Sequence, residues 1–220
     1  MPQIADNGVP GGESPFEQGD CKVRRLIVGM TGATGAIYGI RLLEALKLAK
    51  VETHVVISKW ARKTIEHETE RTYEDVCALA SVSHSSGDMG ATISSGSFIT
   101  EGMVIAPCSM RTLAAIAHGY GDTLVHRAAD VVLKERRPLV LVARETPLSE
   151  VHLENMLKLS RIGVTILPPM PAFYNHPESL DDIVDHAVAR ILDNFAIPAD
   201  FARRWDGKLK GRVLPITPSE

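Results

Sequence analysis

The chain has 220 residues, of which 45% are hydrophobic and 23% are charged, and its formal net charge is −3. That composition is ordinary for a globular protein with a full core, and the interspersed acidic and basic residues give no electrostatic footprint for nucleic acid. Three scattered cysteines without a C-x-x-C pair exclude a disulfide framework and a cysteine zinc site, and no apolar run reaches the roughly 18 residues of a membrane span.

The two ends of the chain differ in composition from its middle. Residues 1–22 are polar, lack periodicity and carry four acidic residues, so we expect a disordered N-terminal extension and not a signal or transit peptide. Residues 23–197 contain no internal linker and predict one α/β domain, and residues 198–220 form a tail rich in Pro, Arg and Lys. Together with the unpaired cysteines, these features favour a cytoplasmic protein.

The chain is organised around its first predicted strand, residues 26–28, which is apolar throughout. The turn TGATG, residues 31–35, follows it and leads into a predicted amphipathic helix, residues 36–50. Strand, glycine turn and helix is the layout in which backbone N–H groups and a helix N-terminus bind a phosphate. The hydroxyls of Thr31 and Thr34 are further candidate donors to such an anion.

The next predicted strand, residues 54–58, narrows the choice of ligand. It ends in Ser58, where a dinucleotide site usually has an acidic residue, and this favours a mononucleotide phosphate or a ribityl chain. Two predicted helices follow, at residues 59–69 and 73–80. Residues 81–102 are rich in Ser, Gly and Thr, so we expect a loop or several short elements there.

The remainder of the chain continues to alternate strands and helices. The remaining predicted strands are residues 103–106, 139–142 and 164–167. The remaining predicted helices are residues 110–118, 124–136, 149–162 and 181–195. Continuous apolar strands alternating with helices predict a Rossmann-like or flavodoxin-like fold, in which one parallel sheet has helices on both faces.

Ligands of such sheets bind at the carboxyl ends of the strands, so the segments that directly follow the strands form one candidate rim. These segments are residues 31–35, 58, 107–112, 144–145 and 168–174. They contain hydroxyls, glycines, two arginines, one glutamate and two aromatic residues, but no spacing typical of metal ligands, and we predict no metal site.

Basic residues outside the glycine turn can hold a second anion. Arg127 and Lys134 lie seven residues apart on one predicted helix, and Arg144 follows a predicted strand. Arginine binds phosphate through two parallel hydrogen bonds, so this set can neutralise two separate phosphates. Taken singly, Arg127 and Lys134 also fit a solvated helix face on which they pair with Asp130 or Glu135.

Several runs in one order carry a resemblance to a known family. They are MTGATGA, ISK, SSGS, PCS, RAADVVLKERRPLVLVARE, HLENMLKLS, PAFYNHP, VARIL and RRW, and they span about residues 25–205. On these runs the chain resembles the UbiX-like flavin prenyltransferases, in the branch associated with phenolic-acid decarboxylases.

The resemblance implies a transferase that joins the dimethylallyl group of dimethylallyl monophosphate to reduced FMN, at N5 and C6, without a metal. It further implies that the prenylated FMN serves a UbiD-type decarboxylase and that the chain forms a homo-oligomer, a dodecamer.

The same resemblance implies roles for individual residues. Those on FMN-binding positions of the family are Gly32, Ala33, Thr34, Ser58, Ser109, Met110, Arg111, Thr112 and Arg144. Those on or beside its prenyl-phosphate positions are Arg127, Lys134, Tyr174 and Arg190. Those tied to catalysis or to closure of the site by the tail are Thr34, Glu68, Lys134, Glu145 and Trp205. The base that removes the C6 proton is Glu68, Glu145 or the departing phosphate, and these alternatives stay open.

Two other functions remain as hypotheses. A subunit that only carries FMN to a decarboxylase would need the flavin site but not Lys134, Arg190 and Tyr174 around a second phosphate. A flavin-dependent cysteine decarboxylase would need a catalytic histidine, for which the sequence shows no motif. Both aromatic residues also have a purely structural interpretation. Tyr174 could pack within a proline-rich loop, and Trp205 could anchor the tail to the domain.

Overall fold

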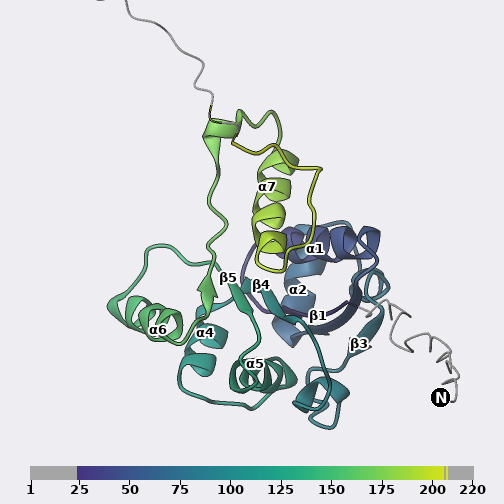
Figure 1. The fold of residues 1–220 in the computed structure, drawn as a ribbon, viewed down its shortest axis with the longest axis vertical. Helices are drawn as coiled ribbons and strands as arrows, with labels where there is room; N and C mark the ends of the chain where they lie inside the picture. The colour runs from purple at the N-terminus through teal and green to yellow at the C-terminus, as the bar shows by residue number, and fades with distance from the viewer. Residues whose placement is uncertain (1–23, 206, 208–220) are drawn as a thin grey trace, which may run out of the picture.

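The computed structural model describes residues 24–205 and 207, so the predicted extension, residues 1–22, and most of the distal tail lie outside the described residues (Figure 1). Six parallel strands form a single sheet in the order β3-β2-β1-β4-β5-β6. The strands are β1 (Arg25–Met30), β2 (Glu52–Ile57), β3 (Val82–His84), β4 (Gly102–Cys108), β5 (Leu139–Ala143) and β6 (Thr165–Ile166). This arrangement confirms the predicted fold class.

Helices cover both faces of the sheet because consecutive residues of each strand point to opposite sides and both sides are apolar. Val28, Val104 and Val140 pack with one group of helices, and Ile105 and Leu141 with the other. The first group comprises α1 (Ala36–Leu48), α2 (Lys59–Glu68), α3 (Tyr73–Cys77) and α7 (Leu180–Asp193). The second comprises α4 (Met110–Ala117), α5 (Leu124–Lys134) and α6 (Glu150–Arg161).

The two segments that the sequence left irregular contain short elements. Residues 81–102 include strand β3 and a single 3-10 turn, Thr92–Ser94, as expected for several short pieces. A second 3-10 turn, Phe173–Asn175, precedes α7 and was not predicted. Among the described residues, no helix combines the length and the apolar character that crossing a membrane requires.

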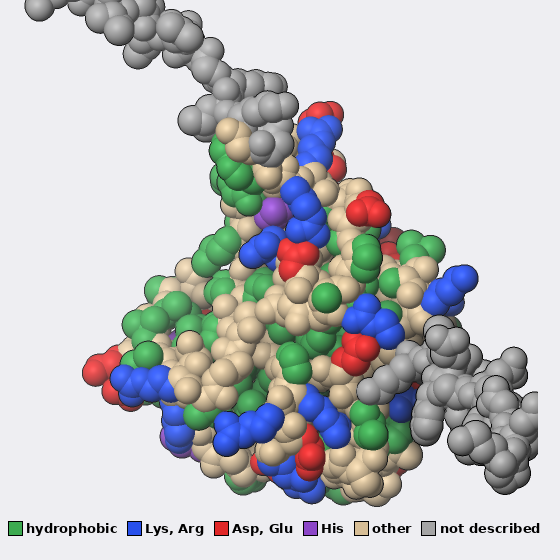
Figure 2. Space-filling model, in the orientation of Figure 1, with side chains coloured by type: hydrophobic (Ala, Val, Ile, Leu, Met, Phe, Trp, Pro, Cys, Tyr) green, Lys and Arg blue, Asp and Glu red, His purple; other side chains and the backbone are tan. Residues whose placement is uncertain are grey.

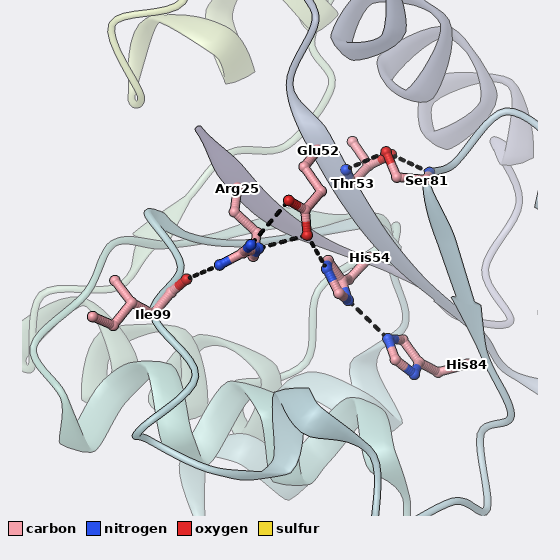
Figure 3. Close-up of polar contacts among 7 residues, drawn as sticks. All are labelled: Arg25, Glu52, Thr53, His54, Ser81, His84 and Ile99. Atoms are coloured by element: carbon pink, nitrogen blue, oxygen red, sulfur yellow. Dashed lines mark hydrogen bonds and ion pairs between the residues drawn. The ribbon is translucent and has the colours of Figure 1, made fainter. Parts of the chain in front are cut away.

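A polar network lies at the start of β1 and β2, on the side of the sheet away from α1 (Figure 3). Arg25 donates two hydrogen bonds to the carboxylate of Glu52, at 2.6 and 2.9 Å. Glu52 also lies 2.9 Å from Nε2 of the buried His54, whose Nδ1 lies 2.9 Å from Nε2 of His84. The network therefore ties the edge strand β3 to the centre of the sheet.

This network makes stability depend on pH. The hydrogen bond from Arg25 lowers the pKa of Glu52 from 4.5 to about 2, against the opposing effect of burial and with further help from His54. A carboxylate whose pKa is depressed stabilises the fold above its unfolded value and stops doing so as pH falls from about 4.5 toward 2. We expect Glu52→Gln to lower the free energy of unfolding by roughly 1–3 kcal/mol at pH 7.

Urea unfolding at pH 7 and at pH 3.5 measures this effect, and the difference between Glu52→Gln and the wild type should narrow at the lower pH. Glu66→Gln is the control, because Glu66 pairs with Arg62 on the exposed surface of α2 and should change stability by at most about 0.5 kcal/mol. An equal deficit of Glu52→Gln at both pH values would contradict the assignment.

Candidate active site

The centre of the site is the point where the sheet order reverses, between the neighbouring strands β1 and β4. Thr31 fastens the two strand ends together there. Its hydroxyl donates to the carbonyl of Pro107 (2.9 Å) and accepts from the backbone N–H of Ser109 (2.8 Å). Because Thr31 is buried and its hydroxyl proton is used in this way, it supports the rim and is not the anion donor that the sequence suggested.

A hydroxyl-rich pocket opens beside this reversal. Ser58 caps the N-terminus of α2 by accepting from the N–H of Ala61 (3.1 Å), and Ser109 caps α4 by accepting from Thr112 (3.4 Å). The pocket is lined by Thr31, Gly32, Ser58, Lys59, Trp60, Ser86, Ser109, Arg111, Thr112, Thr123, Val125 and His126. Two helix N-termini, several hydroxyls and two basic side chains at one pocket make a site for an anion such as a phosphate.

The structure brings five of the predicted FMN-binding residues to this pocket. They are Gly32, Ser58, Ser109, Arg111 and Thr112. Gly32 lets the side chain of Trp60 lie directly against the glycine turn, because a Cβ at position 32 would lie 2.4 Å from Cβ of Trp60. Met110 is the first residue of α4 and its side chain is buried in the core, so a contact to a ligand there would come from its backbone. Trp60, Ser86, Thr123 and His126 were not predicted, since they lie outside the runs that suggested a site.

The N-terminus of α1 is bonded to a carboxylate of the same chain. Oε2 of Glu68 accepts from the backbone N–H groups of Gly35 and Ala36, both at 2.9 Å. Burial alone would raise the pKa of Glu68, but hydrogen bonds from the Thr34 hydroxyl and from these two N–H groups lower it overall. The backbone N–H groups that the sequence suggested for a phosphate are thus bonded to Glu68 in this structure. The helix N-termini at the pocket are those of α2 and α4, and Glu68 is held beside Thr34 as an ionised group.

A second pocket lies between the segment after β6 and helix α7. Its polar side chains include Tyr174 from the 3-10 turn and His186 and Arg190 from α7. Nη1 of Arg190 donates to Asp193 (2.9 Å), and Arg204 from the chain after α7 donates to the same carboxylate (2.8 and 3.0 Å). Figure 2 shows basic, acidic and histidine side chains gathered over this upper part of the molecule.

Trp205 belongs to the same cluster. Its ring lies edge-on to Tyr174, with ring centres 5.8 Å apart and an interplanar angle of 87°. Trp205 and Tyr174 are both about half exposed, so their rings line an open surface and do not sit in the core. The chain after α7 thus returns to Tyr174, one of the residues that line this pocket.

Arg127 and Lys134 do not share this pocket within one chain, contrary to the expectation that they lie beside Tyr174 and Arg190. Arg127 donates to the carbonyl of Ser94 (3.1 Å) and to Asp130 (2.7 Å), and Lys134 donates to Glu135. The reason is topological: α5 covers the face opposite α7 and ends just before β5 begins, at the amino edge of the sheet. In a single chain the alternative pairings with Asp130 and Glu135 are the ones observed.

Arg144 and Glu145 follow β5, which lies between β4 and β6 in the sheet. The backbone N–H of Arg144 donates to Cys108 (3.2 Å), and Glu145 accepts from the N–H of Thr146 (3.1 Å). Both side chains are exposed on the rim. They occupy the strand end between the pocket at β1 and β4 and the pocket beyond β6.

Cys108 ends β4, one of the strands whose carboxyl ends form the rim. Cys108 is fully buried, and burial raises the pKa of its thiol, so it is not an activated nucleophile. Across residues 24–205 and 207, no group of three or more His, Cys, Asp or Glu side chains is placed to hold a metal ion.

A doubly wound parallel sheet with a hydroxyl-lined pocket at its reversal point is typical of nucleotide-binding and flavin-binding proteins. The sequence profile of the family described as Flavoprotein matches residues 15–192. The chain belongs to this family and, within it, to the UbiX-like flavin prenyltransferases, an enzyme family.

Three similar proteins show how close the relationship is. The probable UbiX-like flavin prenyltransferase of Streptomyces sp. (strain D7) is 67% identical over 190 residues, which cover 86% of this chain and 95% of that protein. The dodecameric FMN-dependent UbiX-like decarboxylase from Escherichia coli O157:H7 is 65% identical, with a TM-score of 0.82 over 83% of this chain and 100% of that one. AnUbiX (PadA1), solved in complex with FMN and dimethylallyl pyrophosphate, is 54% identical, with a TM-score of 0.84 over 84% of this chain and 99% of that one.

Proposed function

We propose that this protein transfers the dimethylallyl group of dimethylallyl monophosphate to N5 and C6 of reduced FMN. The observation that carries the proposal is the presence of two polar pockets along one rim. The hydroxyl-lined pocket at β1 and β4 suits the flavin phosphate, and the pocket with Tyr174 and Arg190 suits the phosphate of the prenyl donor. The complex of AnUbiX with FMN and dimethylallyl pyrophosphate supports this pairing of ligands.

The pocket beyond β6 assists departure of the phosphate. Breaking the allylic C–O bond leaves a phosphate dianion and a cationic five-carbon fragment, so fixed positive donors must meet the oxygen as its charge develops. The guanidinium of Arg190 and the hydroxyl of Tyr174 supply such donors, and Arg144 lies on the rim between the two pockets. Trp205 offers the face of an indole ring to the cationic fragment.

The other assigned residues bind the flavin and remove the proton that C6 loses. FMN, when bound, supplies the nucleophilic N5 and C6, and Gly32, Ala33 and Thr34 form the turn beside it. Glu68 is available as a base because its lowered pKa keeps it ionised at neutral pH, and the Thr34 hydroxyl that donates to it can relay a proton to the carboxylate. Glu145, exposed on the same rim, and the departing phosphate remain alternatives for the step at C6.

The assembly and the destination of the product belong to the same proposal. We place Arg127 and Lys134 at the site of a neighbouring copy in a homo-oligomer, which the dodecameric relative from Escherichia coli O157:H7 supports. Exposed apolar side chains on α6 offer an interface, and Figure 2 shows hydrophobic side chains over this helix.

The product, prenylated FMN, passes to a UbiD-type decarboxylase in the cytoplasm, and residues 198–220 help to close the site.

The test is a direct assay of the product. Purified protein is mixed anaerobically with reduced FMN and dimethylallyl monophosphate in the presence of a metal chelator, and the flavin is analysed by mass spectrometry. We expect a flavin heavier by one five-carbon prenyl unit. Flavin that stays bound with an unchanged mass would instead support a subunit that only carries FMN.

A further inference from the structure

His186 lines the pocket that contains Tyr174 and Arg190, but neither the sequence motifs nor the proposed chemistry uses it. It lies on α7 four residues before Arg190, so the two side chains occupy the same face of the helix, one turn apart. The imidazole meets the Tyr174 ring edge-on, with ring centres 6.0 Å apart and an interplanar angle of 90°. Tyr174 also meets the ring of Trp205, so its ring contacts one aromatic side chain from α7 and one from the chain after α7.

The orientation of the imidazole is fixed by a neighbour of Tyr174. The side-chain amide nitrogen of Asn175 lies 2.9 Å from Nδ1 of His186. An amide nitrogen can only donate, so Nδ1 accepts this hydrogen bond and the neutral ring carries its proton on Nε2. Asn175 directly follows Tyr174 in the 3-10 turn, and this bond therefore fastens the turn that carries Tyr174 to helix α7.

The Tyr174 ring contacts aromatic side chains from two different segments of the chain. The side chain is about half exposed, and among the described residues the aromatic contacts recorded for its ring are those with His186 and Trp205. Trp205 lies on the chain after α7, whereas His186 lies within the helix and is partly buried. His186, held within the helix, is therefore the fixed reference for the tyrosine.

We propose that His186 is a positioning residue that holds Tyr174, so that the phenol hydroxyl and the Arg190 guanidinium meet the same phosphate. This inference rests on the proposed function, because it concerns the site of the prenyl donor. A misplaced tyrosine hydroxyl weakens the grip on the phosphate without altering the flavin pocket, which is built at β1, β2 and β4. His186 acts through Tyr174 and does not itself touch the reacting atoms.

The test compares His186→Leu, which removes the ring and its nitrogen, with the wild type. We expect the KM for dimethylallyl monophosphate to rise about tenfold, kcat to change by less than about threefold, and FMN binding to stay the same. In a Tyr174→Phe background, His186→Leu should cause no further rise of KM, because two residues that act as one unit are not additive. Asn175→Leu removes the hydrogen bond but keeps the ring, and we expect a smaller rise in the same direction.

His118→Leu is the matched control. His118 at the end of α4 also bonds an asparagine, with Nε2 2.9 Å from Oδ1 of Asn155 on α6, but on the opposite face of the sheet. Its loss should lower the melting temperature and leave the KM for the prenyl donor unchanged.

An unchanged KM in His186→Leu, or effects of His186→Leu and Tyr174→Phe that multiply, would overturn the inference. If His186→Leu does not fold, Asn175→Leu decides by the same criterion. A wild-type protein that forms no prenylated flavin would refute the proposed function, whereas an active wild type with an unaffected His186→Leu would refute only this inference.

Discussion

Arg190→Ala should retain FMN and lose turnover by about 10²–10³-fold. Removal of one fixed donor from a developing oxyanion typically has an effect of this size, and Arg190 is a cationic donor of the pocket beyond β6. The flavin pocket at β1 and β4 contains no α7 residue, so FMN binding should not change. Flavin titration by fluorescence and single-turnover formation of prenylated FMN measure the two effects separately.

The control for this prediction is Arg161→Ala. Arg161 is an exposed arginine in the last turn of α6, so its removal changes the net charge by the same amount without touching either pocket. Loss of FMN binding in Arg190→Ala, in parallel with activity, would mean that Arg190 holds the flavin phosphate and that the two phosphates are assigned the wrong way round.

A mixing experiment with Lys134→Ala and Arg190→Ala tests whether Lys134 serves the pocket of a neighbouring copy. If it acts on the pocket of a neighbouring copy, Lys134→Ala and Arg190→Ala are each nearly inactive, but a co-assembled mixture regains activity. Random assembly of equal amounts gives about a quarter of the sites both native residues. A mixture that stays inactive after unfolding and reassembly together would show that both residues serve the pocket of one copy.

The fold was predictable from particular strands. Residues 26–28, 103–106 and 139–142 are apolar without interruption, as strands buried on both faces must be, and all three lie at the centre of the sheet. Strand β3 was not predicted as a strand, because its exposed edge position imposes no apolar pattern on Val82–His84. The rule that ligands bind at the carboxyl ends of the strands then located the rim.

The contacts within the rim were not predictable, because they join residues far apart in sequence. Glu68 bonds the start of α1 from the end of α2, and no local pattern marks it as a cap. Thr31 reads as an anion donor in the glycine turn, but its hydroxyl bonds the carbonyl of Pro107 in the next strand of the sheet. Lys134 was expected beside Tyr174 on the basis of family resemblance alone, which does not say which copy of the chain supplies a residue.

The second large effect concerns stability. Gly39→Ala should lower the free energy of unfolding by about 3 kcal/mol, which corresponds to a fall in melting temperature of about 10 °C. A Cβ at Gly39 would lie 2.3 Å from the carbonyl oxygen of Ala106 and 2.7 Å from Cε of Met30. The methionine end can move, but the oxygen belongs to the backbone of β4, so the whole of α1 must shift away from the sheet.

That shift should also reach the site, because α1 begins directly after the turn formed by residues 31–35. We therefore expect Gly39→Ala to weaken FMN binding as well, whereas a purely local defect would leave it intact. Gly121→Ala is the control, since a Cβ there meets no atom within 4 Å, and its stability should stay within about 0.5 kcal/mol of the wild type. Thermal unfolding and FMN titration at one protein concentration make the comparison. If Gly39→Ala melts like Gly121→Ala, then α1 does not lie as close to β4 as the structure shows, and the geometry of the glycine turn that depends on it is wrong too.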